Sequence, residues 1–94
     1  MPRSRKSRYA TEYRTLIDLL CRMRTDAGVT QIELSARIGT SQSMLSKLER
    51  GVVRMDMADV LDYLDGIGAD PIDFMKEFLK AIDWKPRRVQ KKAR

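Results

Sequence analysis

The side chains that most often carry catalysis are scarce in this sequence. It contains no histidine and a single cysteine, Cys21, and it has no glycine-rich loop of the kind that cradles phosphates. Without these groups no acid–base pair and no activated nucleophile can be assembled, and Asp62 and Asp65 fit a solvated helix face better than a catalytic pair. The same inventory excludes an internal disulfide and argues against a zinc site. We therefore expect neither enzymatic activity nor a cofactor.

Basic residues are concentrated at the two ends of the chain. Residues 1–8 hold four basic and no acidic side chains, and residues 85–94 hold six and none, so residues 9–84 have a net charge of −4 within a total of +6. Runs of like charge stay disordered and commonly bind polyanions. We predict a basic N-terminal arm over 1–8, a folded domain over 9–84 and a basic C-terminal tail over 85–94. The alternative role for these ends is to keep the protein soluble.

The bulk composition is that of one globular domain. With 94 residues, of which 43% are hydrophobic and 34% charged, the chain is long enough for one small core. No apolar run approaches the ~20 residues of a membrane span. The basic N-terminus is not followed by the apolar stretch of a secretory signal. We expect a cytoplasmic protein without a membrane partner.

Apolar residues recur at helical spacing through the body of the sequence. Spacings of three and four residues predict five amphipathic helices and no strand, at residues 11–27, 31–38, 42–50, 57–65 and 71–84. Thr30 and Glu33 are spaced for a capping box, and Ser41 is a good N-cap residue. Asp70 and Pro71 place a cap and a proline at the start of the last helix. The sequence therefore predicts an all-α fold.

The second and third predicted helices are joined by a short turn that begins at Gly39. Two helices joined by a turn of three or four residues containing glycine are the form of a DNA-binding helix-turn-helix. Many helical proteins contain such a pair, so this spacing alone is a weak signal. The specific signal is the combination of residues over 28–51.

Residues 28–51, GVTQIELSARIGTSQSMLSKLERG, resemble the core of the lambda-repressor and Cro-like (XRE-type) family of regulators. Several coupled positions carry the match: the Thr-Gln-x-Glu-Leu opening, the Ala and Ile before Gly39, and Leu-Glu-Arg-Gly at the close. With the flanking helices, the resemblance covers residues 16–74. It implies a five-helix, lambda-repressor-like DNA-binding domain with basic tails and a function in transcription regulation.

The resemblance also implies how double-stranded DNA is bound. The helix that begins at Gln42 is expected in the major groove with its N-terminal residues against the base edges. Gln42 can pair with N6 and N7 of adenine, Ser43 can reach N7 of guanine, and Lys47 can reach O6 and N7 of guanine. Ser46 is a fourth candidate for base contact.

Further residues are expected to contact the DNA backbone or to stabilise the fold of the protein. The start of the second helix favours a phosphate, because its N–H groups and positive dipole end face outward. In family members the equivalents of Gln31 and Gln42 lie side by side. The first contacts the DNA backbone and the second contacts a base. Arg24 and Glu49 match a structural ion pair of many relatives. The expected backbone contacts are Thr30, Gln31, Ser41, Arg50, Arg54 and, in the N-terminal arm, Arg5 and Arg8.

A dimer is expected because regulators of this family usually bind the two halves of a near-palindrome as two-fold pairs. The fourth and fifth helices offer the interface. The alternative is that the same aromatic residues complete the core of a monomer. The predicted interface residues are Phe74, Phe78, Ile82 and Trp84.

The expected function is therefore sequence-specific regulation, as a repressor, at a near-palindromic operator. No small-molecule effector is expected, because the chain has no room for an effector-binding domain. One alternative is a protein-binding adaptor of the same fold, such as an antitoxin or an anti-activator, that holds a partner protein. The other is a nonspecific nucleic-acid binder driven by the basic tails.

Overall fold

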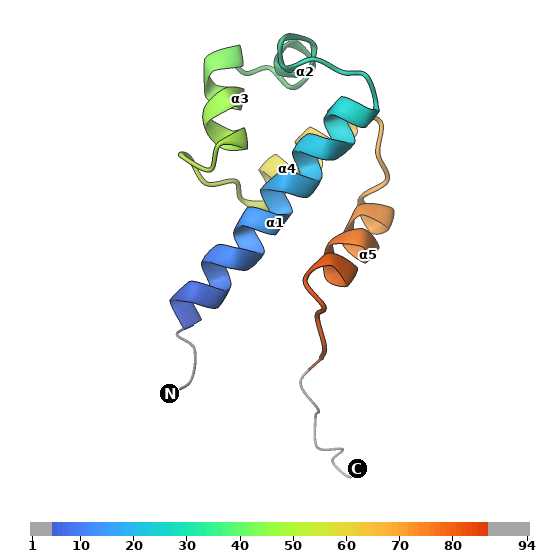
Figure 1. Ribbon diagram of the computed structural model, residues 1–94. Helices are drawn as coiled ribbons and strands as arrows, with labels where there is room; N and C mark the ends of the chain where they lie inside the picture. Colours follow the sequence, from blue (N-terminus) through green and yellow to red (C-terminus); the bar gives the residue numbers. More distant parts are fainter. Residues whose placement is uncertain (1–4, 87–94) are drawn as a thin grey trace.

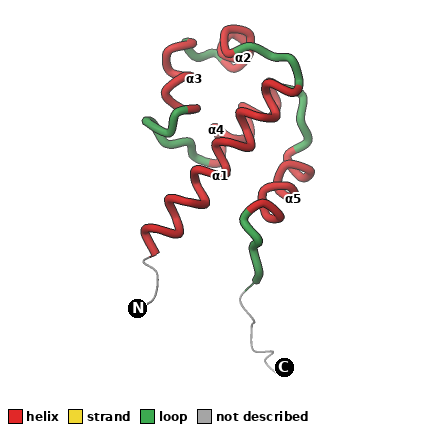
Figure 2. Tube along the Cα trace, viewed as in Figure 1, coloured by secondary structure: helices red, strands yellow, loops and turns green. Residues whose placement is uncertain are grey.

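A computed structural model describes the backbone of residues 5–86 and the side chains of residues 10–86. Over this range the chain forms five α-helices joined by short loops: α1 (Arg5–Asp26), α2 (Gln31–Ile38), α3 (Gln42–Glu49), α4 (Met57–Gly66) and α5 (Pro71–Ala81). The long α1 crosses the molecule, α5 runs beside it, and α2 and α3 lie together at one end (Figures 1 and 2). The all-α, five-helix fold is the one predicted.

The helix starts follow the local capping signals. The Glu33 amide donates to the Thr30 hydroxyl at 3.0 Å, and the Glu33 carboxylate accepts from the Thr30 amide at 2.8 Å, which completes a capping box. Ser41 caps α3 by accepting from the Met44 amide at 3.0 Å. Asp70 caps α5 by accepting from the Ile72 amide at 2.8 Å. These bonds satisfy N–H groups that a helix cannot satisfy itself.

The core draws side chains from all five helices and from the loops around them. Its buried members are Ile17, Leu19, Leu20, Val29, Leu34, Leu45, Met55, Val60, Tyr63, Leu64 and Phe74. Helix α2 packs on both α3 and α4, and α1 packs on α3 and α5. Gly66 lets α2 and α4 approach closely, because a Cβ at this position would collide with the Leu34 side chain and lie 3.0 Å from Ile38. The core thus fixes the position of α3 from several sides.

The structure differs from the prediction at both ends of the domain. Helix α1 begins at Arg5, so Arg5 and Arg8, predicted to lie in the basic N-terminal arm, belong to this helix. Arg and Lys are good helix formers, and residues 5–10 contain no glycine or proline to prevent a helix. The rest of the predicted arm and residues 87–94 of the predicted tail lie outside the described residues. At the other end α5 stops at Ala81, three residues before the predicted end, and Asp83 has a positive φ of 52°.

Phe74 is a second correction. It was predicted at a dimer interface, but it is only 1% exposed and belongs to the core of the monomer. Its ring stacks on that of Phe78, with the ring centroids 6.2 Å apart. By contrast, three large apolar side chains, Met57 and Leu61 of α4 and Ile72 of α5, are exposed.

Candidate nucleic-acid interface

The turn between α2 and α3 is built by the backbone. Gly39 ends α2 in the left-handed conformation, with φ 73°, which glycine adopts without steric cost. The Gly39 and Thr40 amides both donate to the Ser35 carbonyl, the latter at 2.9 Å. Buried Leu34 and Leu45 anchor the two helices in the core. This geometry leaves the opposite side of α3 facing outward.

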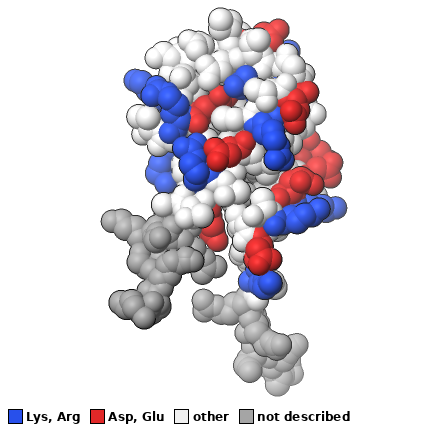
Figure 3. All heavy atoms as spheres, in the orientation of Figure 1, with Lys and Arg blue, Asp and Glu red and all other residues white. Residues whose placement is uncertain are grey.

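The exposed side of α3 carries the side chains predicted to contact bases. Gln42, Ser43 and Lys47 are exposed, whereas Leu45 and Glu49 of the same helix are buried. In Figure 3, Lys and Arg side chains predominate at the edge of the molecule that carries α3. This face therefore offers hydrogen-bonding groups and positive charge together, as binding to a nucleic acid requires.

Ser46 has a partner within the protein. Its side chain is half-buried, and its hydroxyl accepts a hydrogen bond from Nε of Arg50 at 3.3 Å. This contact holds Arg50, the residue that caps the C-terminal end of α3, close to the helix. Ser46 is thereby less available to a base than Gln42, Ser43 or Lys47.

Two glutamines connect α3 to α2. Nε2 of Gln42 donates to Oε1 of Gln31 at 2.7 Å, and Nε2 of Gln31 donates to Oε1 of Glu49 at 2.8 Å. Gln42 and Gln31 lie at the N-terminal ends of α3 and α2, so the two helix starts are joined side by side. The structure brings these two residues together as the family resemblance implies.

Glu49 lies at the centre of a buried polar cluster. Its carboxylate pairs with Arg24 through two bonds, Nε–Oε2 at 2.7 Å and Nη2–Oε1 at 2.9 Å. The Tyr63 hydroxyl donates to Oε2 at 2.6 Å. Among the described residues, no buried side-chain nitrogen or oxygen lacks a hydrogen-bond partner. Arg24 and Glu49 thus brace α1 against α3 from beneath the exposed face.

The electrostatics of this cluster keep Glu49 ionised. Burial alone would raise the pKa of the Glu49 carboxyl, but the hydrogen bonds from Arg24, Tyr63 and Gln31 lower this pKa below its usual range. Burial and the bond to Glu49 raise the pKa of the Tyr63 hydroxyl, which therefore stays a donor. Burial also raises the pKa of the neighbouring Cys21 thiol to about 11, so this cysteine is a poor nucleophile.

The sequence did not indicate every residue of this cluster. Tyr63 and Arg14 were not predicted to take part, yet Arg14 donates to the Glu49 carbonyl at 3.4 Å. Both lie far from Glu49 along the chain. A tyrosine within an apolar helix face gives no sign of the partner its hydroxyl will meet, so no sequence signal identified it.

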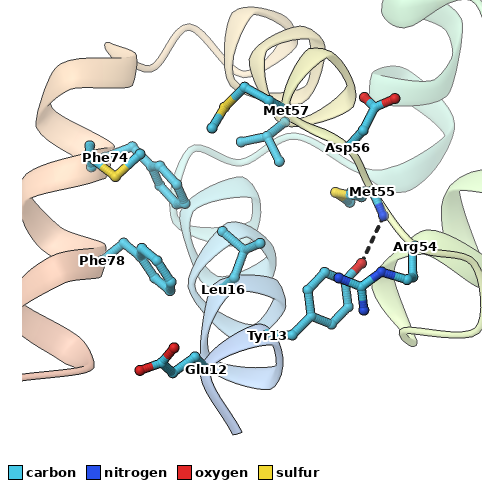
Figure 4. Close-up of a pocket in the computed structure, with 11 residues that line it drawn as sticks. Glu12, Tyr13, Leu16, Arg54, Met55, Asp56, Met57, Phe74 and Phe78 are labelled. Atoms are coloured by element: carbon cyan, nitrogen blue, oxygen red, sulfur yellow. Dashed lines mark hydrogen bonds between the residues drawn. The ribbon is translucent and has the colours of Figure 1, made fainter. Parts of the chain in front are cut away.

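The residues predicted to contact phosphates lie around α3 in several settings. Thr30 and Ser41 are exposed and act as N-caps, which directs the N-terminal ends of α2 and α3 outward. Arg54 is exposed and lies over the Tyr13 ring, with its guanidinium carbon 4.3 Å from the ring centroid. The Tyr13 hydroxyl in turn accepts from the Met55 amide at 2.8 Å (Figure 4). The Arg54 side chain is thus held against Tyr13 of α1, shortly after the C-terminal end of α3. The side chains of Arg5 and Arg8 lie outside the described residues.

A family model described as a helix-turn-helix domain matches residues 16–74. An XRE-family-like protein from Pseudomonas syringae pv. tomato str. DC3000 is 38% identical, with a TM-score of 0.77 over 81% of this chain and 93% of that chain. Two mutants of the restriction-modification controller protein C.Esp1396I are 16% and 17% identical, with TM-scores of 0.73 and 0.70. They cover 79% and 76% of this chain and 99% and 92% of their own, and at this identity they show the fold alone. No curated protein matches the chain.

None of the helices in residues 5–86 has the length and apolar character needed to cross a bilayer.

Proposed function

Because the chain belongs to the XRE-type helix-turn-helix family of DNA-binding regulators, we propose that it is a sequence-specific repressor that inserts α3 into the major groove. The observation that carries this proposal is the two-sided character of α3. Gln42, Ser43 and Lys47 are exposed together, while Leu45 and Glu49 hold the helix to the core. A helix held this way presents its N-terminal side chains to base edges at fixed positions.

The three exposed side chains match different groups of the major groove. Gln42 has the acceptor and donor that adenine N6 and N7 require. Lys47 suits the O6 and N7 acceptors of guanine, and Ser43 suits a single acceptor such as guanine N7. Each good bidentate pair discriminates by about 1–3 kcal/mol against the wrong base. Ser46, bonded to Arg50, would make at most a secondary contact.

Phosphate contacts would hold the recognition helix in register. The N-terminal ends of α2 and α3, at Thr30 with Gln31 and at Ser41, provide outward N–H groups for two phosphates. Arg50 and Arg54 follow α3 and would contact the backbone on its far side. Arg5 and Arg8 of α1 would add charge at neighbouring DNA.

A second copy of the chain is the partner that α5 fits best. Ile72, Met75, Leu79 and Ile82 are spaced three, four and three residues apart, so they form one apolar stripe along the helix. Ile72 is 64% exposed and the other three are half-buried, so the stripe has no full covering in the monomer. This spacing is the same in either direction. An antiparallel partner helix would therefore place the partner's Ile82 on Ile72 and the partner's Leu79 on Met75.

Other apolar groups adjoin this stripe. A cavity of about 260 Å³ between α1, α4 and α5 is lined by Leu16, Met57 and Phe78, among others (Figure 4). Trp84, just after α5, is 48% exposed. Phe78, Ile82 and Trp84 remain in the proposed interface, and Phe74 does not. In such a dimer the two α3 helices would bind half-sites about one helical turn apart, and occupation of a promoter would block transcription.

Selection from a random duplex library at physiological salt tests the proposal. We expect an enriched inverted repeat, which the Gln42→Ala/Lys47→Ala double variant no longer enriches. Lys80→Ala, which removes an exposed lysine of α5, is the matched control and should enrich the same repeat. Retention of DNA without enrichment would instead indicate a nonspecific binder. Failure to retain DNA would indicate an adaptor that binds a partner protein.

A further inference from the structure

Five side chains from four helices form one continuous hydrogen-bonded chain that ends on the exposed face. Tyr63 of α4 and Arg24 of α1 donate to Glu49, Gln31 of α2 donates to Glu49, and Gln42 donates to Gln31. Of these five side chains, only Gln42 belongs to the exposed face of α3 that is proposed to contact bases. The other end of the chain is a buried ion pair, since the Arg24 and Glu49 side chains are only 12% and 6% exposed.

The ionised Glu49 sets the direction of every bond toward the surface. A carboxylate can only accept, so Gln31 must turn its NH₂ group toward Glu49. The oxygen of the Gln31 amide then faces Gln42, and Gln42 must in turn present its own NH₂ group to it. Reversing either amide would place two acceptors or two donors against each other. The arrangement of the two glutamines is therefore dictated by Glu49.

This direction determines what Gln42 offers to a base. One N–H of its amide is used by Gln31, which leaves the carbonyl oxygen and the second N–H. An acceptor beside a donor matches adenine, whose N6 group donates and whose N7 accepts. Guanine presents two acceptors, O6 and N7, at the same places in the major groove. An amide held in this orientation therefore matches adenine and leaves one guanine acceptor facing an oxygen.

We propose that Glu49, acting through Gln31, is a positioning residue that determines base specificity, because it orients Gln42 to select adenine. Glu49 touches no base in this arrangement. The inference rests on the proposed function, since it requires Gln42 to face a base. It adds the prediction that residues beneath the surface set which base is chosen.

Reversing the direction of the bonds is the sharpest test. The Gln31→Lys variant places a group that only donates between Glu49 and Gln42, so Gln42 must turn its oxygen toward residue 31. Its NH₂ group then takes the place of the oxygen, where it can donate to O6 of guanine but would meet the N6 donor of adenine. In library selection, the wild type is expected to prefer adenine over guanine by about 5- to 150-fold at one position. Gln31→Lys should prefer guanine there and keep its preferences elsewhere.

Two further variants make the result specific. Gln31→Met should lose the preference at that position, since it removes both bonds and leaves the Gln42 amide free to turn. Ile32→Lys adds the same charge at the neighbouring, exposed residue and should keep the preference for adenine at that position. Gln42→Ala should lose the preference at the base that Gln42 contacts, and this loss identifies the position in the enriched sequence. Adenine retained by Gln31→Lys, or guanine selected by the wild type, would overturn the inference while leaving the proposed function intact. No enriched sequence for the wild type would overturn both.

Discussion

Replacing Arg24 by methionine would leave the Glu49 carboxylate buried without a countercharge. The two side chains are joined by bonds of 2.7 and 2.9 Å and are almost fully covered, so water screens the pair little. Removing one partner of such a pair costs about 3–5 kcal/mol. Because Tyr63 and Gln31 still donate to Glu49, we expect the lower end, about 3 kcal/mol. In a domain of this size that loss lowers Tm by about 12–24 °C.

The loss should depend on pH, with a sign that follows from the Glu49 pKa. In the wild type this pKa is lowered, so Glu49 contributes stability that is present above its unfolded pKa of about 4.3 and is lost as pH falls through the folded pKa. Without Arg24, burial prevails and raises the folded pKa above 4.3. At low pH Glu49 of the variant is protonated, so the destabilisation caused by its buried, unpaired charge becomes smaller. The difference in stability between the two proteins should therefore shrink from pH 7 to pH 4.

Urea unfolding followed by far-ultraviolet circular dichroism measures both effects. The free energy of unfolding of the wild type and Arg24→Met is compared at pH 7 and pH 4. Arg22→Met, on the same helix but exposed, is the matched control and should change the free energy of unfolding by less than about 0.5 kcal/mol. A loss below about 1 kcal/mol at pH 7 would refute the assignment of Glu49 as a buried charge held by Arg24. A difference that does not change with pH would refute the pKa argument.

Three further changes test other parts of the molecule. Gly66→Ala should lower the free energy of unfolding by about 1–3 kcal/mol in urea titrations, because the new methyl group would collide with Leu34; an unchanged value would mean that α2 and α4 can separate at no cost. Leu79→Glu should convert a dimer to a monomer by light scattering with little change in Tm, whereas Lys80→Glu, on the charged side of α5, should stay dimeric. Arg50→Ala should reduce the slope of log affinity against log salt by about 0.9 in fluorescence anisotropy titrations, and an unchanged slope would remove Arg50 from the phosphate contacts.

Local signals explain the parts of the fold that could be predicted from sequence. A cap and the amide it binds are three residues apart or fewer, so Thr30 with Glu33, Ser41 and Asp70 mark helix starts without knowledge of the rest of the molecule. Gly39 likewise ends α2 through its own backbone conformation. Because these signals bracket α2 and α3, the bounds of both helices agree closely with the prediction. The position of Gln42 at the start of α3 follows from the same signals.

Contacts between distant residues explain what could not be predicted. The sequence placed Phe74 on the fifth helix but could not say whether α1 or a second copy covers it; α1 lies against α5, and Phe74 is buried. Tyr63 meets Glu49 only after α4 has packed on α2 and α5. The early start of α1 has a different reason, since a run of basic residues predicts an arm by its charge and a helix by its propensity. Residues 5–8 belong to helix α1, as their helix propensity favours.

The Arg24–Glu49 pair should matter more for base selection than for stability. Replacing a buried ion pair by apolar residues of similar volume is often neutral or stabilising by about 1–4 kcal/mol. The Tyr63 hydroxyl would still bind the Leu20 carbonyl, 3.3 Å away, so Arg24→Met/Glu49→Leu should recover most of the stability that Arg24→Met loses. Gln31, however, loses the acceptor that orients it, and the preference for adenine should fall toward none. A double variant that is stable and still selects adenine would contradict the role of Glu49 in base selection, and one as unstable as Arg24→Met would contradict the stability argument.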